Sequence, residues 1–343
     1  MPINKKRLFV ALTVLFPILL LGQNQLNENE SQSKEGQKAR IVQPELYDVV
    51  SIAEGIGAKW SPNGEKIAFT GPHYHGISVI SSDGKGELKQ LVSGSGGWGF
   101  AWSPDSRKIV FIVRDFEKSQ NWLRIVDVNT RKITTVYGPY QLGYGTVWWL
   151  EDGNIGFFEE SKTLSEPKWV LLDKFGKISE KITSQEKIVY DVSNMLWIMN
   201  ADGSNKKRLQ WSEKPKIRFM TPVWSKMTKK IAVRVHDSAF SYIAITDEDG
   251  KSWQYLADMG ESPQWSPDGN WLIYFISFEG PREGELGISE LYLISVDGKN
   301  KFQLTRTSDE AEIIPRWSPD GTKVLFWSPT SESVFVAKLK IIK

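Results

Sequence analysis

The sequence predicts an all-β fold, a six-bladed β-propeller made of four-stranded antiparallel blades. Three observations lead to this prediction. The phrase Trp-Ser-Pro-Asp-Gly, intact or degraded, recurs six times along the 343 residues. Each copy is followed by a short run of β-branched and aromatic residues, and Asp-Gly pairs separate further runs of the same kind. Self-similar units of this length, each with several short strands, are typical of propellers.

The tryptophan phrase predicts the first two strands of each blade. An extended segment ends on the tryptophan, a tight turn follows, and a second strand begins after the turn. Proline presets φ at the second turn position, aspartate bonds back to the backbone, and glycine tolerates the exit geometry. We expect the tryptophans, one in each blade, to pack between blades. The repeat positions are Trp60, Pro62, Gly64, Trp102, Pro104, Trp148, Trp224, Trp265, Pro267, Gly269, Trp317, Pro319 and Gly321.

A second turn predicts the other two strands of each blade. It carries an Asp-Gly pair between two apolar runs, which is among the strongest local signals of a β-hairpin. A third strand precedes this turn and a fourth strand follows it. The glycines of the second turn are Gly84, Gly203, Gly250 and Gly298.

The spacing of the second turns leaves two blade counts open. Gly203 and Gly250 are 47 residues apart, whereas Gly176 and Gly203 are only 27 residues apart. The short interval holds three apolar runs, near 177–182, 188–192 and 196–199, and leaves little chain for a fourth strand. Either the third blade carries an insertion or a reduced seventh blade lies there. We predict six blades, with seven as the alternative.

The two ends of the repeat region predict how the ring closes. The last repeat supplies three strands, one ending at Trp317 and the others near 324–326 and 334–338, with little chain remaining for a fourth. Residues 46–50 form an apolar run upstream of Trp60, where other repeats have their fourth strand. We expect this N-terminal strand to complete the C-terminal blade, which removes the open edge of the ring.

The N-terminal residues predict export. Lys5, Lys6 and Arg7 precede an apolar stretch from Leu8 to Leu21, which is the pattern of a secretory signal peptide at residues 1–22. An uncleaved membrane anchor is the weaker alternative, because a stable span needs about 20 apolar residues. Residues 23–44 read as a flexible polar linker, and 45–343 as the propeller domain. We therefore expect a periplasmic or secreted protein.

The net charge and the lack of cysteine exclude several kinds of partner and chemistry. The formal net charge is +2, which gives no electrostatic reason to expect nucleic acid or an anionic membrane as partner. The chain has no cysteine, which excludes disulfides, thiol chemistry and a lipid-modified N-terminal cysteine. A cysteine-free exported domain is unremarkable at this size, because a large core does not need disulfides. We expect a monomer.

Strand order predicts where binding occurs. The Ser-Pro-Asp-Gly and Asp-Gly turns share one face of the ring, which we call the turn face. The second-to-third connections and the blade-to-blade connections share the other, which we call the loop face. These connections vary in length, and variable loops on a rigid scaffold commonly carry binding. They include residues 71–76, 114–121, 277–290 and 308–314 and the region after Glu159.

Candidate chemistry on the loop face is sparse, and we assign no catalytic residue, no cofactor and no metal. His73 and His75 would point to one side of an extended chain, so with His236 they are the weak candidates for a transition-metal site. Carboxylates at the channel mouth could instead hold Ca²⁺, although their spacing matches no calcium loop and favours solvated surface. A Gly-x-Ser-x-Gly nucleophile elbow is missing, since Ser93 and Ser95 lie in a glycine-rich connection without that spacing. The acidic residues are Glu279, Glu283, Glu285, Glu290, Asp309, Glu310 and Glu312.

The tryptophan phrase, together with Leu196–Leu209 (Leu-Trp-Ile-Met-Asn-Ala-Asp-Gly-Ser-Asn-Lys-Lys-Arg-Leu), resembles the TolB-type, WD40-like propeller repeat (PD40). The resemblance spans roughly residues 46–343 and implies an extracytoplasmic, non-catalytic propeller that binds a protein partner in the envelope. Two alternatives stay open. One is a propeller enzyme, a metal-dependent lyase or a hydrolase, acting on polysaccharide through the central channel. The other is a regulatory propeller related to prolyl-oligopeptidase-type peptidases, without their catalytic domain.

Overall fold

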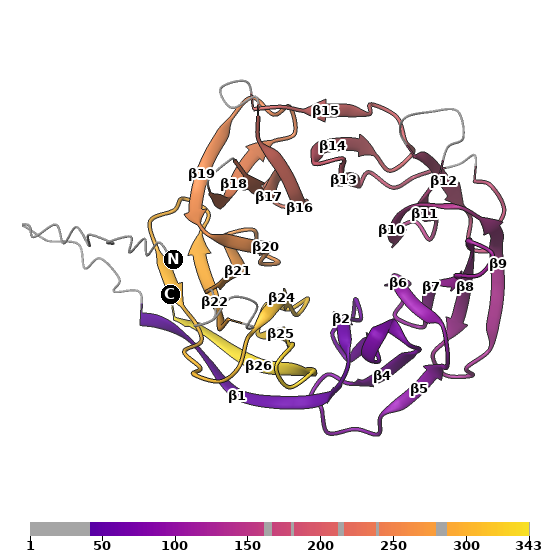
Figure 1. The fold of residues 1–343 in the computed structure, drawn as a ribbon, viewed down its shortest axis with the longest axis horizontal. Helices are drawn as coiled ribbons and strands as arrows, with labels where there is room; N and C mark the ends of the chain where they lie inside the picture. The colour runs from indigo at the N-terminus through magenta and orange to yellow at the C-terminus, as the bar shows by residue number, and fades with distance from the viewer. Residues whose placement is uncertain are drawn as a thin grey trace, which may run out of the picture. The chain divides into compact units, whose positions relative to one another are not determined.

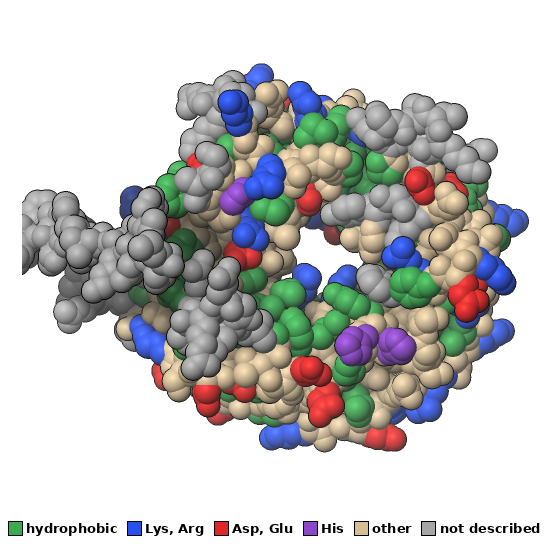
Figure 2. Space-filling model, viewed as in Figure 1, with side chains coloured by type: hydrophobic (Ala, Val, Ile, Leu, Met, Phe, Trp, Pro, Cys, Tyr) green, Lys and Arg blue, Asp and Glu red, His purple; other side chains and the backbone are tan. Residues whose placement is uncertain are grey.

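The structure, a computed structural model, describes residues 42–160, 167–179, 182–211, 216–237, 240–278 and 287–342. Within these ranges the chain forms seven separate antiparallel sheets arranged as the blades of a ring (Figure 1). A central opening remains between the blades (Figure 2). The described residues include no helix that is long and apolar enough to cross a membrane. The signal peptide and most of the linker predicted at residues 1–44 lie outside the described residues.

Four blades have the predicted arrangement of four consecutive strands running from the channel outward. Each begins on the extended segment that leads into the repeat phrase. Blade one comprises β2 (Ile56–Trp60), β3 (Lys66–Thr70), β4 (Ile77–Ser81) and β5 (Lys89–Val92). Blade two comprises β6 (Gly96–Trp102), β7 (Lys108–Asp115), β8 (Gln120–Asp127) and β9 (Ile133–Tyr140). Blade five comprises β16 (Arg218–Ser225), β17 (Lys230–His236), β18 (Ser241–Asp247) and β19 (Trp253–Asp258). Blade six comprises β20 (Gly260–Trp265), β21 (Trp271–Ser277), β22 (Ser289–Ser295) and β23 (Lys301–Gln303).

Blade seven joins the two ends of the propeller, as predicted. Its strands are β24 (Ile313–Trp317), β25 (Lys323–Ser328), β26 (Ser333–Ile342) and, on the outside, β1 (Val42–Glu54). β1 pairs antiparallel with β26 over nearly its whole length, with Leu46 opposite Leu339 and Val50 opposite Val336. The strand is longer than the predicted run at 46–50 and begins slightly before the expected domain boundary at residue 45. The closing pair leaves the last blade with four strands.

The prediction of six blades is wrong, and the alternative of seven is correct. The additional blade, blade four, consists of β13 (Lys187–Val192), β14 (Met195–Asn200) and β15 (Lys207–Leu209). Its Asp-Gly turn at Gly203 joins β14 to β15, so these correspond to the third and fourth strands of other blades. β13 then corresponds to the second strand, and the described part of the chain contributes no innermost strand with a tryptophan phrase to this sheet. A count of tryptophan phrases therefore misses the blade.

Blade three is also reduced. It comprises β10 (Leu142–Trp149), β11 (Ile155–Glu159) and β12 (Lys168–Leu172). Its fourth strand is represented by a single bridge between Leu172 and Ile178, just after the turn at Gly176. The apolar run predicted near 177–182 thus belongs to blade three, whereas the runs near 188–192 and 196–199 are strands of blade four.

The repeat phrase folds as predicted because its serine organises the turn. The hydroxyl of Ser318 donates to Asp320 and accepts from the backbone N–H of Lys323, at 2.5 and 2.9 Å. Gly321 takes a φ of 72°, which favours glycine. Ser61, Ser103 and Ser266 make the corresponding bonds in blades one, two and six.

The repeat tryptophans link neighbouring blades, as expected. The indole N–H of Trp60, Trp102, Trp265 and Trp317 each donates to a backbone carbonyl on the innermost strand of the preceding blade. The acceptor is in each case the residue just before that strand's own tryptophan. Bonds of 3.1–3.3 Å of this kind connect blades five, six, seven, one and two in an unbroken series.

Two repeat tryptophans differ from this arrangement. In blade three the register position belongs to Trp149 rather than to the predicted Trp148, because Trp149 lies opposite Ile155 as Trp60 lies opposite Ile67. The Trp149 indole donates to Gly153 of its own turn, while Trp148 packs against Phe158 and Trp169. Trp224 in blade five follows blade four, whose described strands include no innermost strand to supply the carbonyl.

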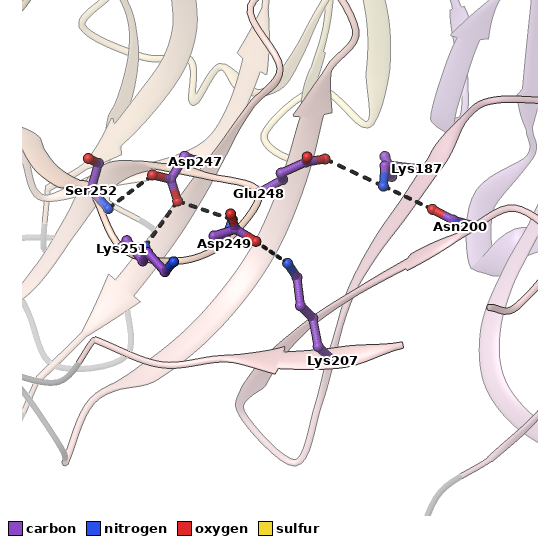
Figure 3. A network of polar contacts seen from close by, with 8 residues as sticks. All are labelled: Lys187, Asn200, Lys207, Asp247, Glu248, Asp249, Lys251 and Ser252. Carbon is purple, nitrogen blue, oxygen red and sulfur yellow. Dashed lines mark hydrogen bonds and ion pairs between the residues drawn. The ribbon is translucent and has the colours of Figure 1, made fainter. Parts of the chain in front are cut away.

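Blades four and five share an apolar cluster and are joined in addition by polar contacts near the turn face (Figure 3). Lys187 of β13 donates to Asn200 and lies 3.4 Å from Glu248 of the next blade. Lys207 forms an ion pair with Asp249 in the same turn of blade five. Asp247 fixes that turn by accepting from the backbone N–H groups of residues 249, 251 and 252.

The core lies between neighbouring blades rather than in one central mass. For example, Phe275 and Leu293 of blade six pack in one cluster with Val324 and Ala337 of blade seven. Similar clusters occupy the other described junctions. Because each blade buries its faces against its neighbours, the scaffold is rigid and the connections at the two faces are free to vary.

Candidate functional site

The loop face differs from the turn face in how its connections are built. The turns of the repeat phrase are short and internally bonded, whereas the second-to-third connections range from the two residues between β13 and β14 to the eleven between β21 and β22. Figure 2 shows the loop face, on which the histidine side chains are visible in purple. The longest connections, after β11 and after β21, lie partly outside the described residues.

Exposed aromatic side chains occupy the second-to-third connections of four blades. Tyr74, Phe116, Phe240 and Phe278 lie in blades one, two, five and six, with exposed fractions of 39%, 59%, 70% and 42%. Large apolar rings on a surface lose water contact favourably when a partner covers them, and aromatic residues are enriched at the centres of protein interfaces. The loop face therefore presents anchors distributed around the ring.

The conformation predicted for the paired histidines is wrong. Residues Pro72–Tyr74 form a short 3-10 turn in which His73 and Tyr74 have φ values of 56° and 60°, so the chain is not extended there. His73 and His75 are exposed. The Nδ1 atom of His236, at the end of β17, lies 3.1 Å from the hydroxyl of Ser241.

The three histidines do not form one metal-ligating group. Figure 2 shows histidine side chains in two separate places, a neighbouring pair and one on the other side of the central opening. Among the described residues, no three His, Cys, Asp or Glu side chains come together as a set that could hold a metal ion. Glu279, Glu283 and Glu285 lie outside the described residues.

Two of the predicted acidic residues do come together, between blades six and seven. Glu290 in β22 and Glu312, just before β24, are only 5% and 4% exposed. Thr307 connects them, because its N–H donates to Glu290 and its hydroxyl donates to Glu312, both at 2.9 Å. Thr305 adds a second hydroxyl donor to Glu312 at 3.1 Å.

The environment of this pair changes its acidity. Burial raises the pKa of Glu312 to about 7, and the neighbouring charge of Glu290 acts in the same direction, while the hydrogen bond from Thr307 opposes it. One oxygen of Glu290, Oε2, is buried and has no hydrogen-bond partner among the described residues. Glu312 can therefore hold a proton near neutral pH, which is a property of carboxyls that act as general acids or bases.

The other predicted acidic residues are arranged as surface groups. Glu310 accepts hydrogen bonds from the hydroxyls of Ser328 and Ser331, and Asp309 is exposed. Ser93 and Ser95 lie in the connection between β5 and β6, away from any strand-to-helix turn. This arrangement offers no nucleophile elbow within the described residues.

The aromatic loop tips were not singled out from the sequence. A usable signal exists, since Phe116 and Phe240 are isolated rings in otherwise polar segments between strands. The proximity of Glu290 to Glu312 had no sequence signal, because it depends on a parallel bridge between Ser289 and Ala311 that joins two blades.

Comparison with known proteins supports the repeat type. Residues 179–339 match the family model of the TolB beta propeller domain. The predicted resemblance to TolB-type repeats is therefore confirmed, and the matched segment includes blade four.

Solved structures with the same fold include enzymes. An oligogalacturonate lyase from Vibrio parahaemolyticus is 16% identical, with a TM-score of 0.61, over 87% of this chain and 98% of that protein. An oligogalacturonate lyase in complex with manganese is also 16% identical, with a TM-score of 0.60, over 88% of this chain and 98% of the other. A prolyl endopeptidase structure is 12% identical, with a TM-score of 0.54, over 84% of this chain and 50% of the other. At these identities the likeness shows the fold alone.

Proposed function

We propose that this chain is an exported, non-catalytic β-propeller, similar to TolB, that binds a protein partner in the cell envelope or periplasm through its loop face. The TolB-type repeats support the class of protein. The assignment of binding to the loop face rests on the exposed aromatic rings in the second-to-third connections of four blades. Because these connections all leave the same face, one partner surface can cover several rings together.

The proposal is tested by removing rings from one face at a time. In the loop-face variant, Phe116→Ser is combined with Phe240→Ser. In the matched control, Phe175→Ser is combined with Met227→Ser, which removes side chains that are 72% and 68% exposed in turns of the other face. Each protein serves as bait for detergent-solubilised envelope proteins, which are quantified by mass spectrometry.

We expect the wild-type protein and the turn-face control to capture the same partner, and the loop-face variant to lose at least about 2 kcal/mol of binding free energy. Equal capture by all three baits would contradict the proposal. Export is tested separately, by N-terminal sequencing of the protein recovered from the periplasmic fraction. A mature N-terminus near residue 23 supports cleavage, whereas an intact N-terminus in the membrane fraction supports the anchor.

A second candidate, an enzyme acting on polysaccharide, is favoured by the buried carboxyl pair. Glu312 holds its proton near neutral pH and lies beside Glu290 on the loop face, next to the channel-lining strand β24. The lyases of the same fold suggest a first substrate, acidic oligosaccharides such as oligogalacturonate. Cleavage is followed by chromatography of the products, with and without added Mn²⁺. Turnover that is lost in Glu312→Gln and kept in Asp309→Asn supports the enzyme.

A further inference from the structure

We propose that the channel holds a binding site for one oxyanion, a carboxylate or phosphate group, between Lys59 of blade one and Arg316 of blade seven. This site is independent of the loop-face proposal, because it lies on the innermost strands near the turn face. Lys59 and Arg316 occupy the same position in their blades, the residue just before the repeat tryptophan. Their strands are neighbours in the ring, since Trp60 of β2 donates to the carbonyl of Arg316 on β24.

A cavity of about 350 Å³ lies at this junction. Lys59, Arg316 and Gln264, which fill the equivalent position in three consecutive blades, all line it, together with the prolines Pro62, Pro267 and Pro319 of the adjoining turns. Lys59 also borders a second, smaller cavity of about 130 Å³, whose other walls include Gly57 and Gly145. Each space is large enough for a small anion, and Lys59 borders both of them.

The two cations are half-buried and have no carboxylate partner among the described residues. No Asp or Glu within the described ranges lies within ion-pair distance of either side chain. The Lys59 ammonium donates to the carbonyl of Phe100 at 2.6 Å and lies 4.9 Å from the centre of that ring. Arg316 has no side-chain hydrogen bond to another described residue, and its Nε is buried without an acceptor.

Burial makes this arrangement costly without a ligand. Loss of water and then the nearby charge of Arg316 lower the pKa of Lys59 to about 7, and burial also lowers the pKa of Arg316. Two like charges that each lose part of their water destabilise a fold unless a counter-charge is present. An oxyanion between them supplies that counter-charge and accepts the unused N–H donors.

Two contrasts within the ring support a dedicated site. Arg234 of blade five forms an ion pair with Glu261 of blade six at 2.6 Å, so another partly buried cation of the ring has its carboxylate, although its Nε, like that of Arg316, is buried without an acceptor among the described residues. In blades two and five the position before the tryptophan holds Ala101 and Val223, which pack in clusters between blades. The fold therefore does not require a charged residue at this position. The cations found there in blades seven and one are explained instead by binding of an anion.

The test is calorimetric titration of the full mature protein with inorganic phosphate and, separately, with citrate as the carboxylate probe. We expect one site per chain for at least one probe, and the stronger of the two identifies the group. Near pH 8 binding should take up protons, because an anion raises the pKa of Lys59. The measured heat should therefore change with the ionisation enthalpy of the buffer.

Three variants decide the assignment. Arg316→Gln and Lys59→Gln should each weaken the bound probe by about tenfold or more. Lys299→Gln, which removes the same charge from an exposed turn, should bind as the wild type does. Thermal unfolding without any anion separates binding from folding, since Arg316→Gln should be at least as stable as the wild type when an uncompensated charge is removed. Absence of saturable binding of both probes, or equal affinity in all four proteins, would overturn the site, as would a large loss of stability in Arg316→Gln.

Discussion

The ring consists of two arcs that are held together differently. In blades five, six, seven, one and two, each repeat tryptophan after the first donates to the carbonyl of the blade before it. In blades three and four this series is interrupted. Trp149 bonds within its own turn, and blade four contributes no innermost strand among the described residues. The tryptophan of the repeat phrase therefore supplies a link between blades, in addition to the turn that the phrase forms within its own blade.

Blades three and four, which we call the irregular arc, are joined to each other and to blade five by side chains of other kinds. Phe158 and Tyr190 pack their rings 4.6 Å apart across blades three and four, and Trp169 donates to the carbonyl of Ala201. Beyond blade four, ion pairs from Lys187 and Lys207 reach blade five (Figure 3). A propeller can thus close with a blade that lacks the phrase, provided that its neighbours supply aromatic packing and charge pairs.

The largest effect should come from opening the ring at blade seven, where its two ends join. Blade seven belongs to the regular arc, which consists of blades five, six, seven, one and two. Deletion of residues before Ser51 removes most of β1 and exposes the edge of β26 and the apolar side chains beneath it. We expect a loss of at least about 4 kcal/mol in the free energy of unfolding, or failure to fold. Circular dichroism during heating measures this, with a chain beginning at Ile41 as control. The same melting temperature in both truncated chains would contradict closure by β1.

A smaller effect should distinguish the two arcs directly. Trp265→Phe removes an indole and its bond to the carbonyl of Val223, whereas Trp224→Phe removes an indole that has no such acceptor. Both tryptophans are partly buried. Urea unfolding should show Trp265→Phe to be less stable than Trp224→Phe by about 1 kcal/mol, the net contribution of one hydrogen bond. If Trp224→Phe proves the more damaging change, the inter-blade bond is not what the phrase supplies.

The carboxyl pair between blades six and seven predicts a pH dependence. The folded protein keeps the pKa of Glu312 at about 7, above its ordinary value of 4.5, so protonation favours folding. This contribution is complete below about pH 4.5 and is lost as the pH rises through about 7. Glu312→Gln should therefore gain stability relative to the wild type at about pH 8 but little at about pH 5.

Differential scanning calorimetry at the two pH values measures this difference. Asp309→Asn, an exposed change in the same connection, serves as the control and should shift equally little at both. A Glu312→Gln protein whose relative stability does not change with pH would show that the carboxyl is not held protonated.

The smallest effect concerns the ion pairs of the irregular arc. Lys187→Met removes contacts to Asn200 and Glu248, and both charged side chains are partly exposed to solvent. We expect a loss of less than about 1 kcal/mol, which high salt should reduce further. Urea unfolding at low and high salt measures it. A loss independent of salt would indicate that Lys187 contributes to this junction by the packing of its stem rather than by its charge.

The regular blades could be predicted from the sequence, whereas blade four and the register of blade three could not. The phrase around Trp60, Trp102, Trp265 and Trp317 carries local turn chemistry, so the regular blades and the closure at β1 were predictable. The blade number was not, because blade four lacks the phrase and its strand β13 looks like an insertion in a count of tryptophans. The shift from Trp148 to Trp149 in blade three arose because two adjacent tryptophans fit the pattern equally well and only strand register separates them.

The functional surfaces were less accessible to sequence reasoning. Strand order correctly separated short turns from variable loops, but it gave no means to find residues that meet across blades. The contact between Glu290 and Glu312 and the meeting of Lys59 with Arg316 each join strands of different blades. Such contacts depend on ring geometry, which a local pattern does not contain.

The assignment of recognition to the loop face is tested most directly by crosslinking in the living cell. A photoreactive amino acid is placed at Phe116 or Phe240 on the loop face and, for comparison, at Phe175 or Met227 on the turn face. Recognition through the loop face predicts one covalent protein adduct of the same partner from both loop-face positions and none from the turn-face positions. Adducts confined to the turn-face positions would contradict it.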